Sequence, residues 1–155
     1  MALPAVALPA ATAVHIAVGN AQARQAETES VGAQRLATVI HPDASVSAYA
    51  QIGAGCFLAA RSVVAPQARL GIGVIVNHGA VIDHDVEVGA FCHIAPNATL
   101  GGNVLVGNRV LVGSGASILP GLSICDDVTV GAGSVVIASI TAVGVYAGVP
   151  ARRVR

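Results

Sequence analysis

The sequence contains little charge and almost no aromatic residues. Of its 155 residues, 10% are charged and 3% aromatic, tryptophan is absent, and all eight basic residues are arginine. Ordinary globular chains carry about 25% charged residues. The formal net charge is zero, whereas nucleic-acid binding requires a basic stripe. We therefore expect no nucleic-acid partner.

Long apolar runs are also missing, although 54% of the residues are hydrophobic. Gly, Asn, Asp or His interrupts almost every apolar stretch, and a membrane helix needs about 18 to 20 consecutive apolar residues. We expect no membrane partner. The apolar surface must then be buried in a core or in a subunit interface.

Cysteine is rare as well. The three cysteines, Cys56, Cys92 and Cys125, are an odd number with wide spacings, which suits a reducing compartment better than a disulfide scaffold. No basic residue precedes the apolar opening, residues 1–18, which argues against a secretory signal. The sequence therefore predicts a cytoplasmic protein.

What the sequence does contain is a repeat of six residues. From Ile40 onward, every sixth residue is Ile, Leu or Val at seventeen consecutive positions, namely 40, 46, 52, 58, 64, 70, 76, 82, 88, 94, 100, 106, 112, 118, 124, 130 and 136. Mostly small or β-branched residues follow four places later, and glycine recurs one place later at 53, 71, 89, 101, 107, 113 and 131. This period fits neither a helix nor a simple alternating strand.

The repeat predicts one short strand and one turn per six residues, with three such units forming a triangular coil. The aliphatic residue points inward, and glycine or asparagine permits the positive φ of the turn. The pattern resembles the left-handed parallel β-helix of the hexapeptide-repeat acyltransferases over residues 40–141, about six coils. The predicted fold class is therefore mainly β. In this fold, we expect Cys56 and Cys92 to fill the core two coils apart, which is too far for a disulfide.

Titratable residues gather in the segment 76–96. It holds three of the five histidines, His78, His84 and His93, together with Asn77, Asp83, Asp85 and Glu87. Residues on one face of adjacent coils must differ by about 18 positions, whereas these histidines are separated by six, nine and fifteen. We therefore expect no metal site. His84 beside Asp85 suits a general base, because a carboxylate can fix the tautomer of histidine and raise its basicity.

A wider resemblance gives this cluster specific roles. The segment VNHGAVIDHDVEVGAFCHIAPNATLGGNVLVG and the terminal GVPARRVR resemble the bacterial sugar O- and N-acyltransferase family. The resemblance implies that His84 is the catalytic base and that Asp85 raises its basicity. It also implies that His93 contacts the acetyl donor and that Asn77 binds substrate.

The same resemblance assigns three backbone positions to the acetyl donor. Gly102 corresponds to a glycine whose N–H polarises the thioester carbonyl, and Ser114 and Ala132 correspond to positions lining the pantetheine channel. It implies direct acetyl transfer from acetyl-CoA, as co-substrate, to an amine or hydroxyl of a sugar or nucleotide sugar. It also implies a homotrimer with sites at the subunit interfaces.

The N-terminal residues depart from this family pattern. Residues 1–39 resemble only the last portion of a Rossmann-like substrate domain, with a strand at Val14–Val18, a helix at about Ala21–Val31 and a strand at Arg35–Ile40. Residues 142–155 are expected to form a C-terminal tail. We interpret His15 as strand packing and His41 as the junction to the first coil.

Two other functional classes remain open at this stage. The chain could be another hexapeptide enzyme, either a transferase for a small acceptor or a metalloenzyme resembling the γ-carbonic anhydrases, whose zinc lies between subunits. Alternatively, it could be a non-catalytic trimeric scaffold. The identity of the acceptor and the choice between O- and N-acetylation do not follow from the sequence.

Overall fold

The computed structural model describes residues 12–155. One α-helix, α1 (Ala21–Val31), and one 3-10 turn, η1 (Ala33–Arg35), precede a long series of short strands. Asn20 caps α1 by accepting a hydrogen bond from the backbone N–H of Ala23 (2.9 Å), as N-cap asparagines commonly do. Within the described residues, no helix is long and apolar enough to cross a membrane.

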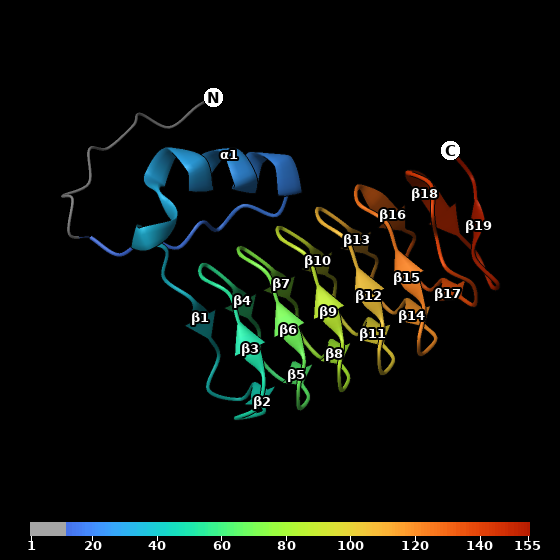
Figure 1. The fold of residues 1–155 in the computed structure, drawn as a ribbon, viewed down its shortest axis with the longest axis horizontal. Coiled ribbons are helices and arrows are strands. Elements are labelled where there is room, and N and C mark those ends of the chain that lie inside the picture. The colour runs from blue at the N-terminus through green and yellow to red at the C-terminus, as the bar shows by residue number, and fades with distance from the viewer. Residues whose placement is uncertain (1–11) are drawn as a thin grey trace.

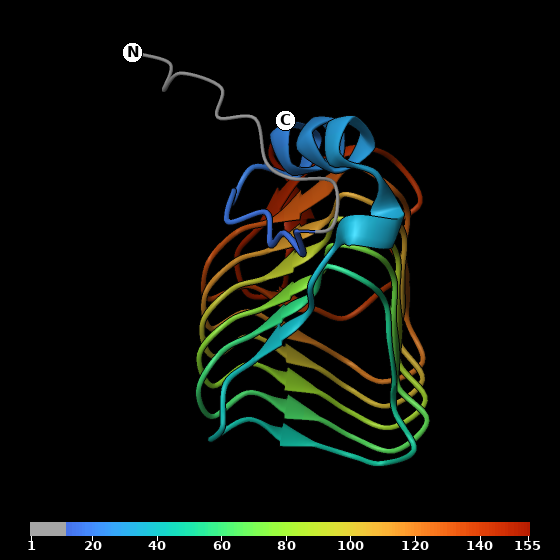
Figure 2. The same cartoon turned by 90° about the vertical axis from the view of Figure 1, so that its left-hand side faces the viewer.

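The strands form a three-sided β-solenoid of about six turns (Figures 1 and 2). Sheet I contains β1 (Val39–Ile40), β4 (Phe57–Leu58), β7 (Ile75–Val76), β10 (His93–Ile94), β13 (Leu111–Val112), β16 (Val128–Val130), β18 (Gly144–Ala147) and β19 (Arg152–Arg153). Sheet II contains β2 (Ser45–Val46), β5 (Val63–Val64), β8 (Val81–Ile82), β11 (Thr99–Leu100), β14 (Ser117–Ile118) and β17 (Val135–Val136). Sheet III contains β3 (Gln51–Ile52), β6 (Arg69–Leu70), β9 (Glu87–Val88), β12 (Leu105–Val106) and β15 (Ser123–Ile124).

The register of the sheets confirms the hexad repeat. His93 pairs in parallel with Ile75 and Leu111, which are one coil of 18 residues away on either side. The turns after sheet I form the I–II corner, and the turns after sheet II form the II–III corner. The predicted hexapeptide solenoid is therefore correct.

The core runs along the centre of the solenoid. From Leu58 to Val136 the aliphatic residues of the repeat are buried, and Leu58, Ile82 and Leu100 are fully so, whereas Ile40 in the first coil is 46% exposed. Cys56 and Cys92 are also fully buried, as predicted. Burial raises the pKa of the Cys56 thiol to about 11 and that of the Cys92 thiol to about 12, so both remain protonated core residues near neutral pH.

The recurring glycines have a different role from the one expected. Gly89 does not adopt a positive φ; a Cβ on it would lie 2.5 Å from the carbonyl oxygen of Gly107 in the next coil. Positive φ occurs two residues further along each turn, where eight non-glycine residues also adopt it, among them Asp85 (58°) and Phe91 (58°). Glycine one place after the aliphatic residue is thus needed for the close approach of successive coils.

The N-terminal segment forms less sheet than expected. The strand expected at Val14–Val18 is reduced to a single bridge between Val14 and Leu36. Of the expected strand Arg35–Ile40, only the last two residues form a strand, β1, and Arg35 is the end of η1. The helix has the expected bounds, and it lies outside the solenoid (Figures 1 and 2). Residues 1–11 of the expected domain remnant lie outside the described residues.

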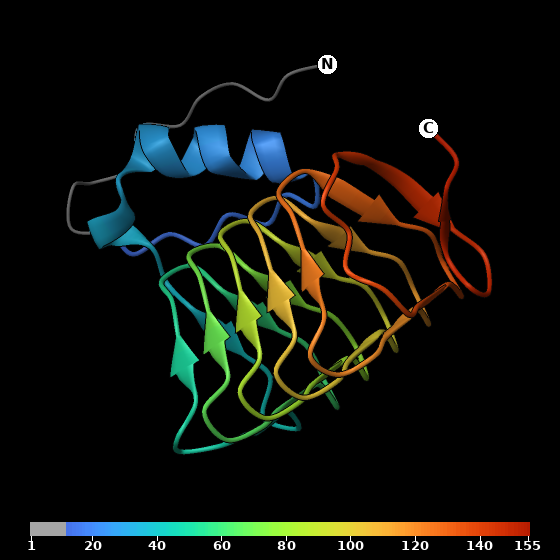
Figure 3. The same ribbon diagram turned by 45° about the vertical axis from the view of Figure 1, so that its right-hand side comes forward.

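The C-terminal residues continue the stack. β18 pairs in parallel with β16, and β19 pairs antiparallel with β18. These strands lie at the end of the solenoid far from β1 (Figure 3). Residues 142–155 therefore add a further rung and an edge strand to sheet I, where the sequence suggested a tail.

Candidate active site

His84 lies on the II–III corner between β8 and β9, in a turn that orients its ring. Asp83 accepts the backbone N–H of His84 through Oδ1 (2.7 Å), and His84 Nδ1 lies 2.9 Å from Asp85 Oδ2. A carboxylate only accepts hydrogen bonds, so Nδ1 carries the proton and Nε2 keeps a free lone pair. The hydrogen bond that His84 donates to Asp85, followed by the negative charge of Asp83, raises the pKa of His84. This geometry suits a general base.

Gly102 lies one coil further along the same corner, directly against the His84 ring. A Cβ at position 102 would lie 2.5 Å from His84 Cε1 and 2.6 Å from Nε2. The carbonyl of Gly102 accepts the N–H of Gly121 (2.9 Å). Among residues 12–155, the N–H of Gly102 has no hydrogen-bond partner, so it remains available to a ligand.

Asn77 and His93 form a second polar pair on sheet I beside the I–II corner. Asn77 Oδ1 accepts the backbone N–H of His78 (2.8 Å), which leaves Asn77 Nδ2 to donate to His93 Nε2 (3.1 Å). His93 Nε2 therefore acts as an acceptor, and the proton of the neutral ring lies on Nδ1. Burial, followed by the positive charge of Arg24, lowers the pKa of His93. The second histidine is thus held neutral.

A cavity of about 300 Å³ lies between this pair and the segment before α1. Its lining consists of His15, Ile16, Ala17, Val18, Gly19, Phe57, Ile75, Asn77 and His93. His15 bonds through Nδ1 to the carbonyl of Ala37 (3.1 Å), and its ring centroid lies 5.9 Å from that of Phe57. The strand expected at Val14–Val18 did not predict that residues 15–19 line a cavity, whereas the 18-residue spacing of Phe57, Ile75 and His93 could have grouped these three.

Ser114 and Ala132 are exposed turn residues of the I–II corner, in successive coils. The carbonyl of Ser114 accepts the N–H of Gly133 (2.8 Å). They follow His78 and Pro96 at intervals of 18 residues and so form one row along this corner. The predicted residues therefore occupy two corners of one chain: Asn77, His93, Ser114 and Ala132 lie at one, and His84, Asp85 and Gly102 lie at the other.

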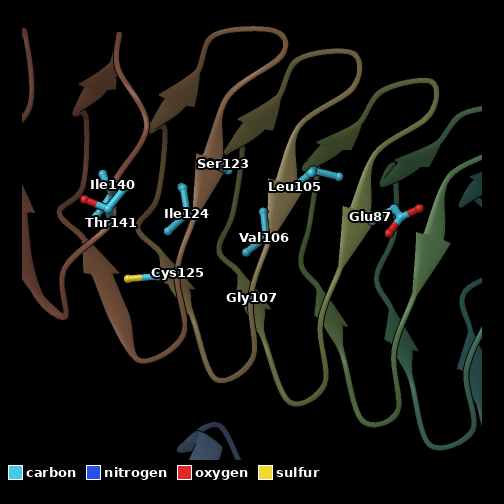
Figure 4. Close-up of a pocket in the computed structure, with 9 residues that line it drawn as sticks. All are labelled: Glu87, Leu105, Val106, Gly107, Ser123, Ile124, Cys125, Ile140 and Thr141. Atoms are coloured by element: carbon cyan, nitrogen blue, oxygen red, sulfur yellow. The ribbon is translucent and has the colours of Figure 1, made fainter.

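A larger cavity of about 420 Å³ lies on sheet III. Figure 4 shows its lining residues along β9, β12 and β15, with Cys125 at the opposite end from Glu87. No histidine lines it. Among residues 12–155, no group of three or more His, Cys, Asp or Glu side chains is arranged to hold a metal ion.

Comparison with known proteins extends these findings. Residues 103–138 match the family model described as bacterial transferase hexapeptide (six repeats). No curated protein sequence matches the chain.

Several solved structures share both fold and sequence with the chain. The acetyltransferase domain of PglB from Neisseria gonorrhoeae is 39% identical, with a TM-score of 0.88 over 92% of this chain and 70% of that one; a structure of it with acetyl coenzyme A also matches. PerB from Caulobacter crescentus, in complex with CoA and GDP-perosamine, is 35% identical, with a TM-score of 0.89 over 92% and 70% of the two chains. WeeI from Acinetobacter baumannii is 26% identical, with a TM-score of 0.58 over the same shares.

The six-residue solenoid and these matches define a hexapeptide-repeat transferase. At 35–39% identity over nearly the whole chain, the chain belongs to the hexapeptide-repeat family of bacterial sugar acetyltransferases. The family expected from the sequence is confirmed.

Proposed function

We propose that this protein transfers the acetyl group of acetyl-CoA to the amine of a nucleotide-linked amino sugar. The observation that carries this proposal is the His84 ring, whose Nδ1 is held by Asp85 (2.9 Å) and whose Nε2 faces Gly102. The chain is similar to PerB, which is described in complex with CoA and GDP-perosamine. This similarity favours an amino sugar as the acceptor.

The reaction follows from these groups. The amine nitrogen attacks the thioester carbon while His84 Nε2 takes its proton, and Asp85 stabilises the imidazolium that forms. The N–H of Gly102 donates a hydrogen bond to the oxyanion of the tetrahedral intermediate. The carbon–sulfur bond then breaks, and the proton passes from His84 to the departing thiolate. The products are the amide and CoA, and no acyl-enzyme forms.

The acetyl donor lies along the I–II corner. His93 contacts its acyl end, Asn77 binds substrate beside it, and the backbone of Ser114 and Ala132 lines the channel for its pantetheine arm. Coils repeat at about 4.8 Å, so the row from Asn77 to Ala132 is about 15 Å long. An extended chain such as pantetheine can follow such a row.

The base and the donor site belong to different copies of the chain. His84 and His93 lie on opposite sides of sheet II, so one copy does not bring them together. The outward residues of sheet II are uncharged: Ser45, Val63, Val81, Thr99, Ser117 and Val135. A neighbouring copy packed against this sheet would place its II–III corner near the donor row, and three copies close into a ring. We therefore propose a homotrimer. We also propose that it is cytoplasmic, because its three free thiols stay reduced in that compartment.

Release of CoA from acetyl-CoA tests this function. GDP-perosamine and a UDP-4-amino sugar are the amine acceptors, and free sialic acid serves as a hydroxyl acceptor. We expect turnover with an amine acceptor, and we expect His84→Asn to remove it while the oligomer stays intact. Turnover with sialic acid alone would mean that the protein is an O-acetyltransferase and not an N-acetyltransferase. Full turnover by the His84→Asn variant would exclude His84 as the base.

A further inference from the structure

Arg24 on α1 is the most deeply buried charged side chain among the described residues, at 1% exposure. Its guanidinium has five N–H donors, and each of them bonds to a backbone carbonyl. Nε donates to Gly73 (2.8 Å), Nη1 to Val18 (2.8 Å) and Gly19 (2.9 Å), and Nη2 to Phe91 (2.6 Å) and Cys92 (3.2 Å). Lysine, with three donors, could not satisfy this set.

Two of these carbonyls belong to residues that line the cavity over His93, and two belong to residues just before His93 in the chain. Val18 and Gly19 line the cavity from the N-terminal segment, and Phe91 and Cys92 directly precede His93 in the chain. Phe91 has a φ of 58°, a conformation that a bulky side chain disfavours. The shortest bond of Arg24, at 2.6 Å, holds the Phe91 carbonyl. One side chain thus fixes the segment above His93 and the backbone that carries it.

The charge of Arg24 is not balanced locally. Among residues 12–155, no carboxylate bonds to Arg24. Other titratable groups around His93 are His15 across the cavity and His78, which shares Asn77 with it. Arg109 binds Asp127 in a bidentate pair (2.7 Å each) and lies 3.7 Å from Asp126. The paired charges of Arg109 and Asp127 largely cancel, so Arg24 is the cation that most disfavours a second positive charge on His93.

We propose that Arg24 is a positioning residue of the active site: it ties Val18 and Gly19 to the backbone before His93 and so positions the ring that accepts from Asn77. The inference rests on the proposed function, in which His93 contacts the acyl donor. Arg24 does not touch the substrate. It acts through the five carbonyls and through its charge, and two substitutions separate these effects.

Arg24→Lys keeps the charge and loses the fork of donors, whereas Arg24→Met loses both. For Arg24→Lys we expect the KM for acetyl-CoA to rise about tenfold with a smaller change in kcat, because a contact made before the transition state is weakened. For Arg24→Met we expect the same rise in KM and, in addition, a higher pKa of His93 in an NMR titration. The shift of His93 is a readout that a purely structural role would not produce.

Thr28→Val is the matched control, because Thr28 is buried on the same helix at 5% exposure and bonds to none of the five carbonyls. We expect it to change neither KM nor the His93 titration. Wild-type KM in Arg24→Lys, or an unchanged His93 titration in Arg24→Met, would overturn the proposal.

If Arg24→Met does not fold, Asn20→Ala removes the helix cap and must raise KM while leaving the pKa of His93 unchanged. A wild-type protein that binds no acetyl-CoA would refute the proposed function, whereas the His93 titration would still test Arg24.

Discussion

The pKa values of the two site histidines are shifted in opposite directions. The Asp85 hydrogen bond raises the pKa of His84, whereas burial and Arg24 lower the pKa of His93. Groups whose environments separate their pKa values in this way can perform different steps of one reaction. His84 is suited to accept a proton, and His93 is suited to remain neutral and donate from Nδ1.

The dependence of activity on pH reports the role of Asp85. His84 must be unprotonated to act, so kcat/KM should fall as the pH drops through its raised pKa. In Asp85→Asn we expect this acidic limb to move to lower pH and the plateau to fall about a hundredfold, because the base is weaker and its tautomer is no longer fixed. Asparagine tolerates the φ of 58° found here, so the turn should persist.

A pH–rate profile of kcat/KM across the neutral range checks this expectation. The unfolding midpoint of the variant serves as the control for the turn. An acidic limb at the wild-type position would contradict the role given to Asp85.

Gly102→Ala tests how closely the His84 ring must be placed. The added Cβ would meet the ring at 2.5 Å, and the ring can swing away because its side chain is 56% exposed. We expect activity to fall about a hundredfold, as when a reacting group is displaced by about 1 Å, with little change in the unfolding midpoint. A variant that unfolds instead, or that keeps full activity, would contradict this placement of the ring.

At the scale of the elements, the coils are spaced by glycine. Gly89→Ala would bring a Cβ within 2.5 Å of the Gly107 carbonyl oxygen and 2.6 Å of its carbon, and neither backbone atom can turn away. We expect a loss of about 2 to 3 kcal/mol in the free energy of unfolding, as for overpacked cores. Urea unfolding measures it, and a change below about 0.5 kcal/mol, typical of neutral surface substitutions, would argue against the tight coil spacing.

The N-terminal segment shows where prediction from the local sequence pattern fails. The helix Ala21–Val31 forms with the bounds expected from the sequence, because it has its own N-cap and ends at Gly32. A strand needs a neighbouring strand to pair with, and Val14 bridges only Leu36 within the described residues. Residues 15–19 instead cross sheet I and become a wall of the cavity over His93.

At the scale of the whole molecule, a site built from two corners predicts complementation. His84→Asn and His93→Gln should each be inactive alone. After denaturation and co-refolding in equal amounts, about a quarter of the interfacial sites in a random ring would combine one intact His84 with one intact His93. Recovery of CoA release to about that fraction is the expected result, and an inactive mixture of correct size would place the site within one chain.

The solenoid and the candidate residues of its site could be predicted from the amino-acid sequence. A six-residue period fixes which side chains point inward, and an 18-residue spacing fixes which residues stack, so His84 could be set beside Gly102 from numbering alone. The sequence also grouped His84 with Asp85, because neighbours in one turn stay close in any fold.

The way in which the N-terminal segment packs on the solenoid could not be predicted from the sequence. The carbonyls bound by Arg24 in the solenoid are 49 to 68 residues away in sequence and belong to the backbone, which has the same chemistry at every position. No residue pattern marks such partners. Their selection depends on where α1 packs, and this packing makes Arg24 a buried support for His93 and residues 15–19 the cover of a cavity.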